Sequence, residues 1–370
     1  MNEANPAQLM PYVTGGAFVL AFVFGAVGNK TNFCTMGAVS DWINMGDTNR
    51  MRMWLLAIAV ALVGSSVLQL AGVVDLSKSI YPGPNFTWLS YLVGGFLFGV
   101  GMTLGSGCSS KTLIRIGGGN LKSLVVYVFL GIAAYMTLRG LFGAFRVDVL
   151  EKASITLAPG QDLPSLAAAA TGMAKATWTA ILAAVIGGTL AAYAYASKEF
   201  RASFDYTLGG VVTGLVVVGG WFVSGKVGYV AEDPQTLQEA FVATNTGRME
   251  SFSFVSPMAY TLEYLMLWTD KSKIVTYGIA SALGVIAGSA AYALATRTFR
   301  WEGFRDAEDT ANHVVGGILM GFGGITALGC TIGQAITGIS TLALGSFITF
   351  AAIVAGSALT MKVQYWRMNS

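Results

Sequence analysis

The sequence predicts an all-α, polytopic membrane protein with about nine transmembrane helices and short re-entrant helices, and three observations lead to this fold class. Hydrophobic residues make up 54% of the 370 residues and charged residues only 11%, whereas a soluble domain carries roughly 25% charged residues to solvate its surface. The mean hydropathy is +0.62. Several apolar segments have the length of about 20 residues that crosses a hydrocarbon layer of ~30 Å.

Nine spans are expected, at residues 12–30, 53–74, 87–106, 121–141, 176–196, 206–224, 274–296, 313–329 and 345–361. Another apolar and aromatic segment, 252–268, contains Pro257 and Glu263. It is interpreted as an interfacial or half-inserted helix, with Glu263 as an interfacial residue rather than a proton carrier. If this segment crossed the membrane, the orientation of every later span would be reversed.

The short loops are alternately basic, which predicts the orientation of the chain. Lysine and arginine follow every second span, at Lys30, Arg50, Arg52, Lys111, Arg115, Lys122, Lys198, Arg201, Arg297, Arg300, Arg305, Lys362 and Arg367. Segment 229–270 is acidic instead. Because basic residues mark cytoplasmic loops, the N-terminus is expected outside and the C-terminus in the cytoplasm. Residues 1–10 lack a basic start followed by a short apolar core, so no removable signal peptide is expected.

A glycine-rich segment occurs twice and predicts an internal repeat. GGFLFGVGMTLGSGC (94–108) and GGILMGFGGITALGC (316–330) agree at seven of fifteen positions without a gap. Five crossings separate the copies, so they are expected to run in opposite directions. A weaker match relates glycines in 15–25 to glycines in 209–219. The chain is therefore expected to be one integral membrane domain, 1–370, with inverted halves at 1–145 and 206–370 and a connecting region with one span at 146–205, a plan common in transporters.

The glycines next to the repeated cysteines predict helix breaks. Gly107 precedes Cys108 and Gly329 precedes Cys330, and hydroxyl-bearing residues follow both cysteines. Irregular backbone at membrane depth is tolerated where protein or a water-filled cavity satisfies it. The start of a new helix offers free N–H groups and a positive dipole end, which suit an anion.

Three isolated cysteines leave several chemistries open. Cys34 lies in GNKTNFCTMG, a turn similar to those at Cys108 and Cys330, and no C-x-x-C pair is present. Three thiolates could bind Cu(I) or Zn, but the usual close spacing is missing and His313 is the sole histidine. Nucleophilic or redox catalysis needs a nearby base or resolving thiol. Recognition of a soft, sulfur-bearing anion is the third possibility. No cofactor and no resident metal are expected.

The cysteine motifs resemble those of the YeeE/YedE family of bacterial sulfur-compound transporters, whose best-described members take up thiosulfate. The resemblance lies in NFCTMG, in GMTLGSGCSSKTLIRIGGGNLKSLVVY and, most specifically, in GFGGITALGCTIGQAITGISTLALGS. It implies a multi-pass protein of the bacterial inner membrane, with a periplasmic N-terminus, that transports its substrate and is not an enzyme. It also implies a central path lined by Cys34, Cys108 and Cys330, along which the anion passes by S–H···S contacts. A cytoplasmic TusA-like sulfur carrier is the implied partner. A selenium compound, another sulfur species, or membrane thiol sulfurtransferase or redox chemistry remain alternatives.

Other polar residues are possible supports for this site. Ser109, Thr331 and Gln334 could donate hydrogen bonds to substrate oxygens or could cap helices. Lys111 and Lys30 could attract the anion, although the sequence favours reading both as basic charges of cytoplasmic loops. Membrane lipid is an expected partner, and nucleic acid is not.

Overall fold

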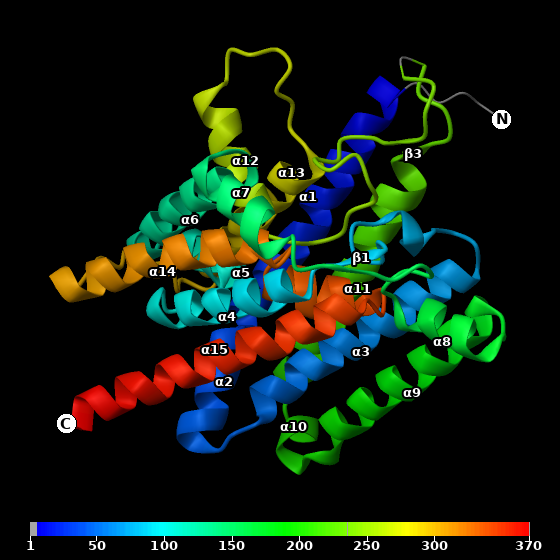
Figure 1. Cartoon of the computed structure of the whole chain (residues 1–370). Coiled ribbons are helices and arrows are strands. Elements are labelled where there is room, and N and C mark those ends of the chain that lie inside the picture. The colour runs from blue at the N-terminus through cyan, green and yellow to red at the C-terminus, as the bar shows by residue number, and fades with distance from the viewer. Residues whose placement is uncertain (1–5, 235, 370) are drawn as a thin grey trace.

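The computed structural model describes residues 6–234 and 236–369 as a bundle of helices with two short sheets (Figure 1). The long helices are α1 (Pro6–Lys30), α3 (Asn49–Leu70), α4 (Trp88–Leu104), α6 (Leu121–Arg139), α9 (Lys175–Ala196), α11 (Phe204–Phe222), α13 (Tyr277–Ala295), α14 (Ala307–Thr326) and α15 (Leu344–Asn369). The short helices are α2 (Thr35–Ser40), α5 (Ser109–Gly117), α7 (Leu141–Phe145), α8 (Leu163–Thr171), α10 (Lys198–Ala202) and α12 (Val255–Met266). The π-helical segments are η1 (Asp41–Met45), η3 (Arg146–Leu150), η4 (Val223–Val227) and η5 (Thr331–Gly338), and η2 (Leu76–Lys78) is a 3₁₀ turn. Strand β1 (Asn85–Phe86) pairs antiparallel with β2 (Ile155–Thr156), and β3 (Tyr229–Val230) with β4 (Ala240–Phe241).

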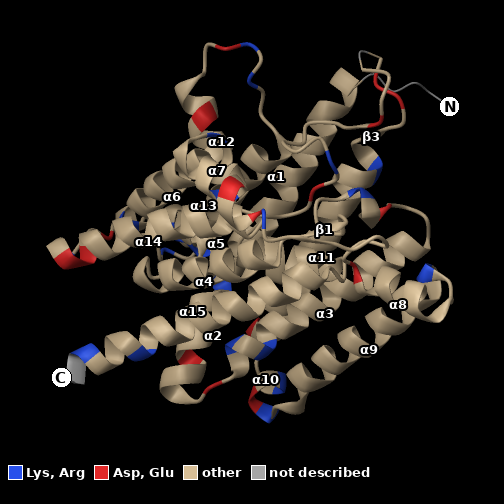
Figure 2. Cartoon of the chain, viewed as in Figure 1, with Lys and Arg blue, Asp and Glu red and all other residues tan. Residues whose placement is uncertain are grey.

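The expected number of spans is confirmed. Within the described residues, nine helices are long and apolar enough to cross a membrane. The helix α12 is not among them, because it has only 12 residues. Figure 2 shows most Lys, Arg, Asp and Glu residues in loops and at helix ends, while long stretches of the helices carry none. The protein is therefore a multi-pass, all-α membrane protein.

The two glycine-rich helices, α4 and α14, pack against each other backbone to backbone. A Cβ atom placed on Gly94 would lie 2.7 Å from the carbonyl oxygen of Gly323, and one placed on Gly101 would lie 2.7 Å from that of Gly316. The two helices are therefore antiparallel. The repeated glycines are needed because helices can approach this closely only where side chains are missing.

The other helix pairs follow the same two-fold pattern. The contact of α1 with α13 in one part of the bundle corresponds to the contact of α11 with α3 in the other. In the same way, the contact of α4 with α15 corresponds to that of α14 with α6. This is the arrangement expected of inverted copies of a four-helix unit. Helices α8 and α9, from the connecting region, lie at the periphery, where α9 packs mainly on α3 (Figure 1).

Segment 252–268 does not span, as expected, but it begins far deeper than an interfacial helix would. Phe252 and Phe254 are 1% and 0% exposed. The Phe252 carbonyl accepts a hydrogen bond from Thr337 Oγ1, which lies 2.7 Å away in η5. Helix α12 then runs outward from this buried start and ends in exposed residues, including Trp268. The deep start brings this segment next to the cysteines.

Candidate functional site

The same backbone turn precedes all three cysteines. Two residues before each cysteine stands a non-glycine residue in the left-handed region, with φ of 52°, 56° and 58° at Asn32, Ser106 and Leu328, respectively. The next N–H donates to the carbonyl five residues back, at 3.1 Å from Phe33, 2.8 Å from Gly107 and 2.7 Å from Gly329. This pattern is the Schellman motif, which ends a helix by satisfying its last carbonyls.

Each cysteine begins a new helix as its N-cap. Cys34, Cys108 and Cys330 have extended backbones and precede α2, α5 and η5. Cys34 Sγ accepts from the Gly37 N–H at 3.3 Å and Cys330 Sγ accepts from the Gly333 N–H at 3.4 Å. The expected helix breaks are therefore present, and the thiols of Cys34 and Cys330 cap the helices that follow them.

The three cysteines meet in one buried cluster. Their side chains are between 0% and 4% exposed. The thiols of Cys34 and Cys108 are in hydrogen-bonding contact. The two repeats cross at this point, because Thr331 beside Cys330 faces Cys108, and Ser109 beside Cys108 faces Cys330. Segments almost 300 residues apart in sequence thus build one site, with Cys108 in the middle.

Two hydroxyls in this cluster have only thiols as polar neighbours. Ser109 Oγ and Thr331 Oγ1 are fully buried; they face the thiols of Cys330 and Cys108, respectively, and no nitrogen or oxygen of a described residue bonds to them. A buried polar group without a partner costs roughly 1–3 kcal/mol, so such groups are normally paired. Both hydroxyls stand in the first turn of a helix that starts at the cluster. They are suited to receive a ligand with oxygen or sulfur acceptors.

Lys111 lies in the interior rather than in a basic loop. It is 8% exposed, and its Nζ lies 2.5 Å from Asn32 Oδ1. Electrostatic interactions link its ammonium group to both Cys34 and Cys108. The loop interpretation of Lys111 is therefore wrong, because the helix break at Gly107 turns α5 back into the protein.

The other predicted supports are placed away from any free contact with a ligand. Lys30 is a surface residue that lies 3.7 Å from Asp205 in an ion pair. Gln334 braces the turn before η5, donating to the Ala327 carbonyl at 2.5 Å and accepting from Ser346 Oγ at 2.6 Å. Among the candidates Ser109, Thr331 and Gln334, the structure thus leaves only the two hydroxyls available.

The glycines before the cysteines allow the chain to turn tightly onto the next helix. A Cβ on Gly107 would lie 3.3 Å from Lys111 Cβ, and one on Gly329 would lie 3.2 Å from Gln334 Cγ. These positions accept a side chain only if the neighbouring residue moves by a few tenths of an ångström. Close packing at these turns thus explains why glycine precedes both cysteines.

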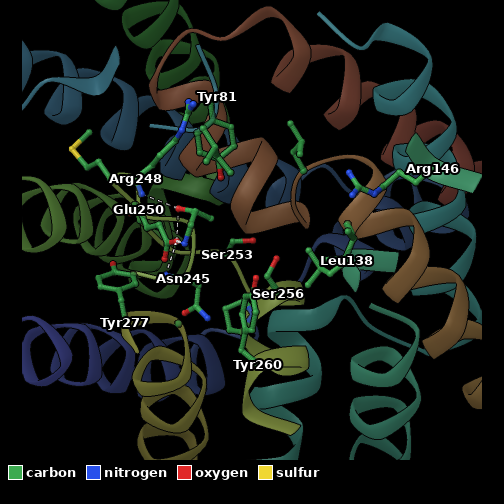
Figure 3. A pocket seen from close by; sticks show the side chains of 18 residues that line it. Tyr81, Leu138, Arg146, Asn245, Arg248, Glu250, Ser253, Ser256, Tyr260 and Tyr277 are labelled. Atoms are coloured by element: carbon green, nitrogen blue, oxygen red, sulfur yellow. Dashed lines mark hydrogen bonds between the residues drawn. The ribbon is translucent and has the colours of Figure 1, made fainter. Parts of the chain in front are cut away.

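A cavity of about 320 Å³, the outer cavity, is lined largely by residues of the acidic segment. Leu328, two residues before Cys330, is also part of its lining. Figure 3 shows Arg248 and Arg146 at opposite sides of this outer cavity. Tyr277 Oη and Asn245 Oδ1 line it and lack partners among the described residues. The outer cavity is therefore polar enough to admit a small anion.

Glu250 is the carboxylate of the outer cavity. One of its oxygens accepts from the Asn245 N–H at 3.1 Å and from the Thr246 N–H and hydroxyl at 2.9 and 2.7 Å. Burial raises the pKa of Glu250 above its usual value, although these three donors oppose the shift. The sequence analysis does not identify the residues of this cavity, because segment 245–260 is predicted to lie at the surface. The alternation of polar and aromatic residues in this segment is the one pattern that indicates its burial.

A second hollow, of about 720 Å³, is lined by residues near the other two cysteines. Ser106, two residues before Cys108, lines this inner groove together with Met36 and Ser40 of α2 and with Lys362 and Tyr365 of α15. Figure 1 shows α2 and α12 at opposite sides of the bundle. The two hollows thus lie on opposite sides of the bundle, and each is lined by a residue two positions before a cysteine.

Comparison with known proteins gives three matches. A family model described as sulphur transport matches residues 30–359. The thiosulfate transporter TsuA of Escherichia coli (strain K12) is 26% identical over 324 residues, which cover 85% of this chain and 84% of that protein. The thiosulfate transporter TsuA of Spirochaeta thermophila is 24% identical over 350 residues, covering 92% of this chain and 95% of that protein. Residues 30–359, which the family model matches, contain Cys34, Cys108 and Cys330.

Proposed function

Because the chain belongs to the sulphur transport family, whose model matches residues 30–359, we propose that it is a transporter, not an enzyme, that takes up thiosulfate or a closely related small sulfur-containing anion. The proposal adds the bacterial inner membrane as its location, with the N-terminus periplasmic and the C-terminus cytoplasmic, as the alternating basic loops favour. The observation that carries it is the buried cluster of three thiols and two hydroxyls that have no nitrogen or oxygen partner among the described residues, with two hollows lined by residues near it.

The order of the contacts suggests a path. Leu328, close to Cys330, lines the outer cavity, whereas Ser106 and Met36, close to Cys108 and Cys34, line the inner groove. Cys108 contacts Cys34 and faces Thr331. The proposed sequence is therefore outer cavity, Cys330, Cys108, Cys34 and inner groove. Each step is short, because neighbouring groups of the path already contact or face each other.

The chemistry of the cluster fits a thiosulfate ion. A neutral thiol is a weak S–H donor that carries no charge, so it can hold the polarizable terminal sulfur without repelling the anion. The hydroxyls of Ser109 and Thr331 can donate to sulfonate oxygens and would then have oxygen partners. The starts of α5 and η5 add positive ends of helix dipoles.

Uptake of radiolabelled thiosulfate by cells without their own thiosulfate transport tests this proposal. Cys34→Ala, Cys108→Ala and Cys330→Ala should each abolish uptake, and Cys→Ser at the same positions should restore little, because a hydroxyl is a poor contact for sulfur. Membrane content of each variant is measured in parallel. If all three alanine variants take up thiosulfate as fast as the wild type, the anion does not pass along the three thiols.

Ser109→Ala and Thr331→Val test the role of the two hydroxyls and should lower uptake. Ser65→Ala is the matched control, because Ser65 is also fully buried with an unpartnered hydroxyl but lines neither hollow. Competition with sulfate and selenosulfate defines the substrate class. A persulfide trapped on a cysteine during turnover, detected by mass spectrometry, would instead favour sulfur-transfer chemistry.

The resemblance to the family also motivates a partner on the cytoplasmic side. We propose that a TusA-like sulfur carrier collects the anion at the inner groove, which is lined in part by Tyr365, a side chain that is 63% exposed. Adding such a carrier inside proteoliposomes should raise thiosulfate uptake. Tyr365→Ala should reduce this stimulation and leave uptake without the carrier unchanged. If the carrier stimulates the wild type and Tyr365→Ala equally, it does not bind at the inner groove.

A further inference from the structure

Lys111 occupies a position that is electrostatically unfavourable by itself. It is the third residue of α5, at the positive end of the helix dipole, where a cation is destabilising. Its side chain is buried, and none of the described residues places a carboxylate within ion-pair distance of its amine. A buried cation without a counter-charge is costly, so a missing anion is the simplest reason for its placement.

Asn32 fixes where this charge lies. Its left-handed backbone, with φ of 52°, ends α1 and directs the side-chain oxygen to Lys111 Nζ at 2.5 Å. A neutral amide oxygen orients the ammonium group but leaves its charge uncancelled. The amine is thereby held beside Cys34 and Cys108, with which it interacts electrostatically.

The charges around the cluster favour a negatively charged ligand. Lys111 supplies a positive charge, Arg115 and Arg50 interact with it electrostatically, and the starts of α5 and η5 add the positive ends of helix dipoles. The buried hydroxyls of Ser109 and Thr331, which have no nitrogen or oxygen partner among the described residues, lie at the same cluster and are free to donate to such an anion. We propose that Lys111, positioned by Asn32, makes the site select divalent over monovalent sulfur anions. This inference rests on the proposed function and specifies the charge of its substrate.

Methanethiosulfonate is a suitable probe, because it keeps the terminal sulfur of thiosulfate and replaces one charged oxygen by a methyl group. The experiment measures how strongly each anion competes with labelled thiosulfate for uptake by the full-length protein. The wild type should prefer thiosulfate. In Lys111→Met this preference should fall by about tenfold or more, as expected when one partner of a buried charge pair is removed. Lys111→Arg should retain part of it.

Two further variants keep the test decisive. Lys30→Met removes an exposed lysine and should leave the preference unchanged. Asn32→Gly keeps the left-handed turn, which glycine adopts readily, but releases the amine, and should reduce the preference to a value between wild type and Lys111→Met. If Lys111→Met does not reach the membrane, the test rests on Asn32→Gly, which should then show a weaker preference for thiosulfate over methanethiosulfonate than the wild type.

The outcomes separate the two proposals. If Lys111→Met prefers thiosulfate over methanethiosulfonate as strongly as the wild type does, Lys111 does not select the charge of the substrate, although the protein still transports thiosulfate. Where Lys111→Met is not produced, the same result for Asn32→Gly decides the question. No thiosulfate uptake by the wild type would instead remove the proposed function itself.

Discussion

The contact between α4 and α14 leads to a sharp prediction for Gly323→Ala. A Cβ at this position would lie 2.6 Å from both the Gly94 carbonyl oxygen and the Phe98 backbone nitrogen. Ordinary contact begins at 3.4 Å, so the helices must separate by about 0.8 Å, because backbone atoms cannot rotate away. Overpacking of this kind costs roughly 1–3 kcal/mol. Thermal unfolding in detergent should therefore occur several degrees lower than in the wild type.

The same change should also reduce transport, because Gly323 lies only seven residues before Cys330. A displacement near 1 Å can lower a rate by on the order of 100-fold. Uptake per folded molecule should thus fall by about tenfold or more, even below the unfolding temperature. The two measurements distinguish loss of protein from loss of geometry.

Gly188→Ala is the matched control. Gly188 lies in the exposed face of α9, and a Cβ there would meet nothing within 4 Å. Alanine in a helix interior is favoured over glycine by roughly 0.5–1 kcal/mol, so this variant should be as stable as the wild type or slightly more stable, with normal uptake. If Gly323→Ala unfolds and transports like Gly188→Ala, close packing of the repeats does not determine the geometry of the cysteines.

Three further predictions address the cavity and the turns. Uptake into proteoliposomes should rise as the outside pH is lowered, because burial raises the pKa of Glu250 and this carboxylate then loses its negative charge at a higher pH than an exposed glutamate does. Glu250→Gln should transport at a high rate with a flatter pH profile. Gln334→Leu leaves Ser346 Oγ and the Ala327 carbonyl without their partner, so it should destabilise the protein by roughly 1–3 kcal/mol and lower uptake. Leu328→Gly should raise the unfolding temperature without loss of uptake, because glycine adopts its φ of 58° without strain; a lower unfolding temperature would contradict this account.

The sequence was sufficient for the spans and for pairing Cys108 with Cys330, because both follow from local composition and from a repeat that can be aligned by eye. It could not pair Asn32 with Lys111, which are 79 residues apart. From the sequence alone, Lys111 cannot be distinguished from the basic residues of a cytoplasmic loop. Nor could it place Phe252 and Phe254 in the core, since their burial depends on Thr337 of a distant helix satisfying the backbone. Long-range contacts, rather than propensities, decide both cases.

Helix α9 acquires a topological meaning from the antiparallel contact of α4 and α14. Each half contributes four spans, α1, α3, α4 and α6 in one and α11, α13, α14 and α15 in the other. Four crossings return a chain to the side where it began, so two such units in direct succession would share one orientation. If the halves are inverted as the repeat predicts, the single crossing of α9 is what reverses the orientation of the second unit. A helix that packs mainly on α3 at the rim of the bundle is thus what allows two thiols of the same repeat to face each other.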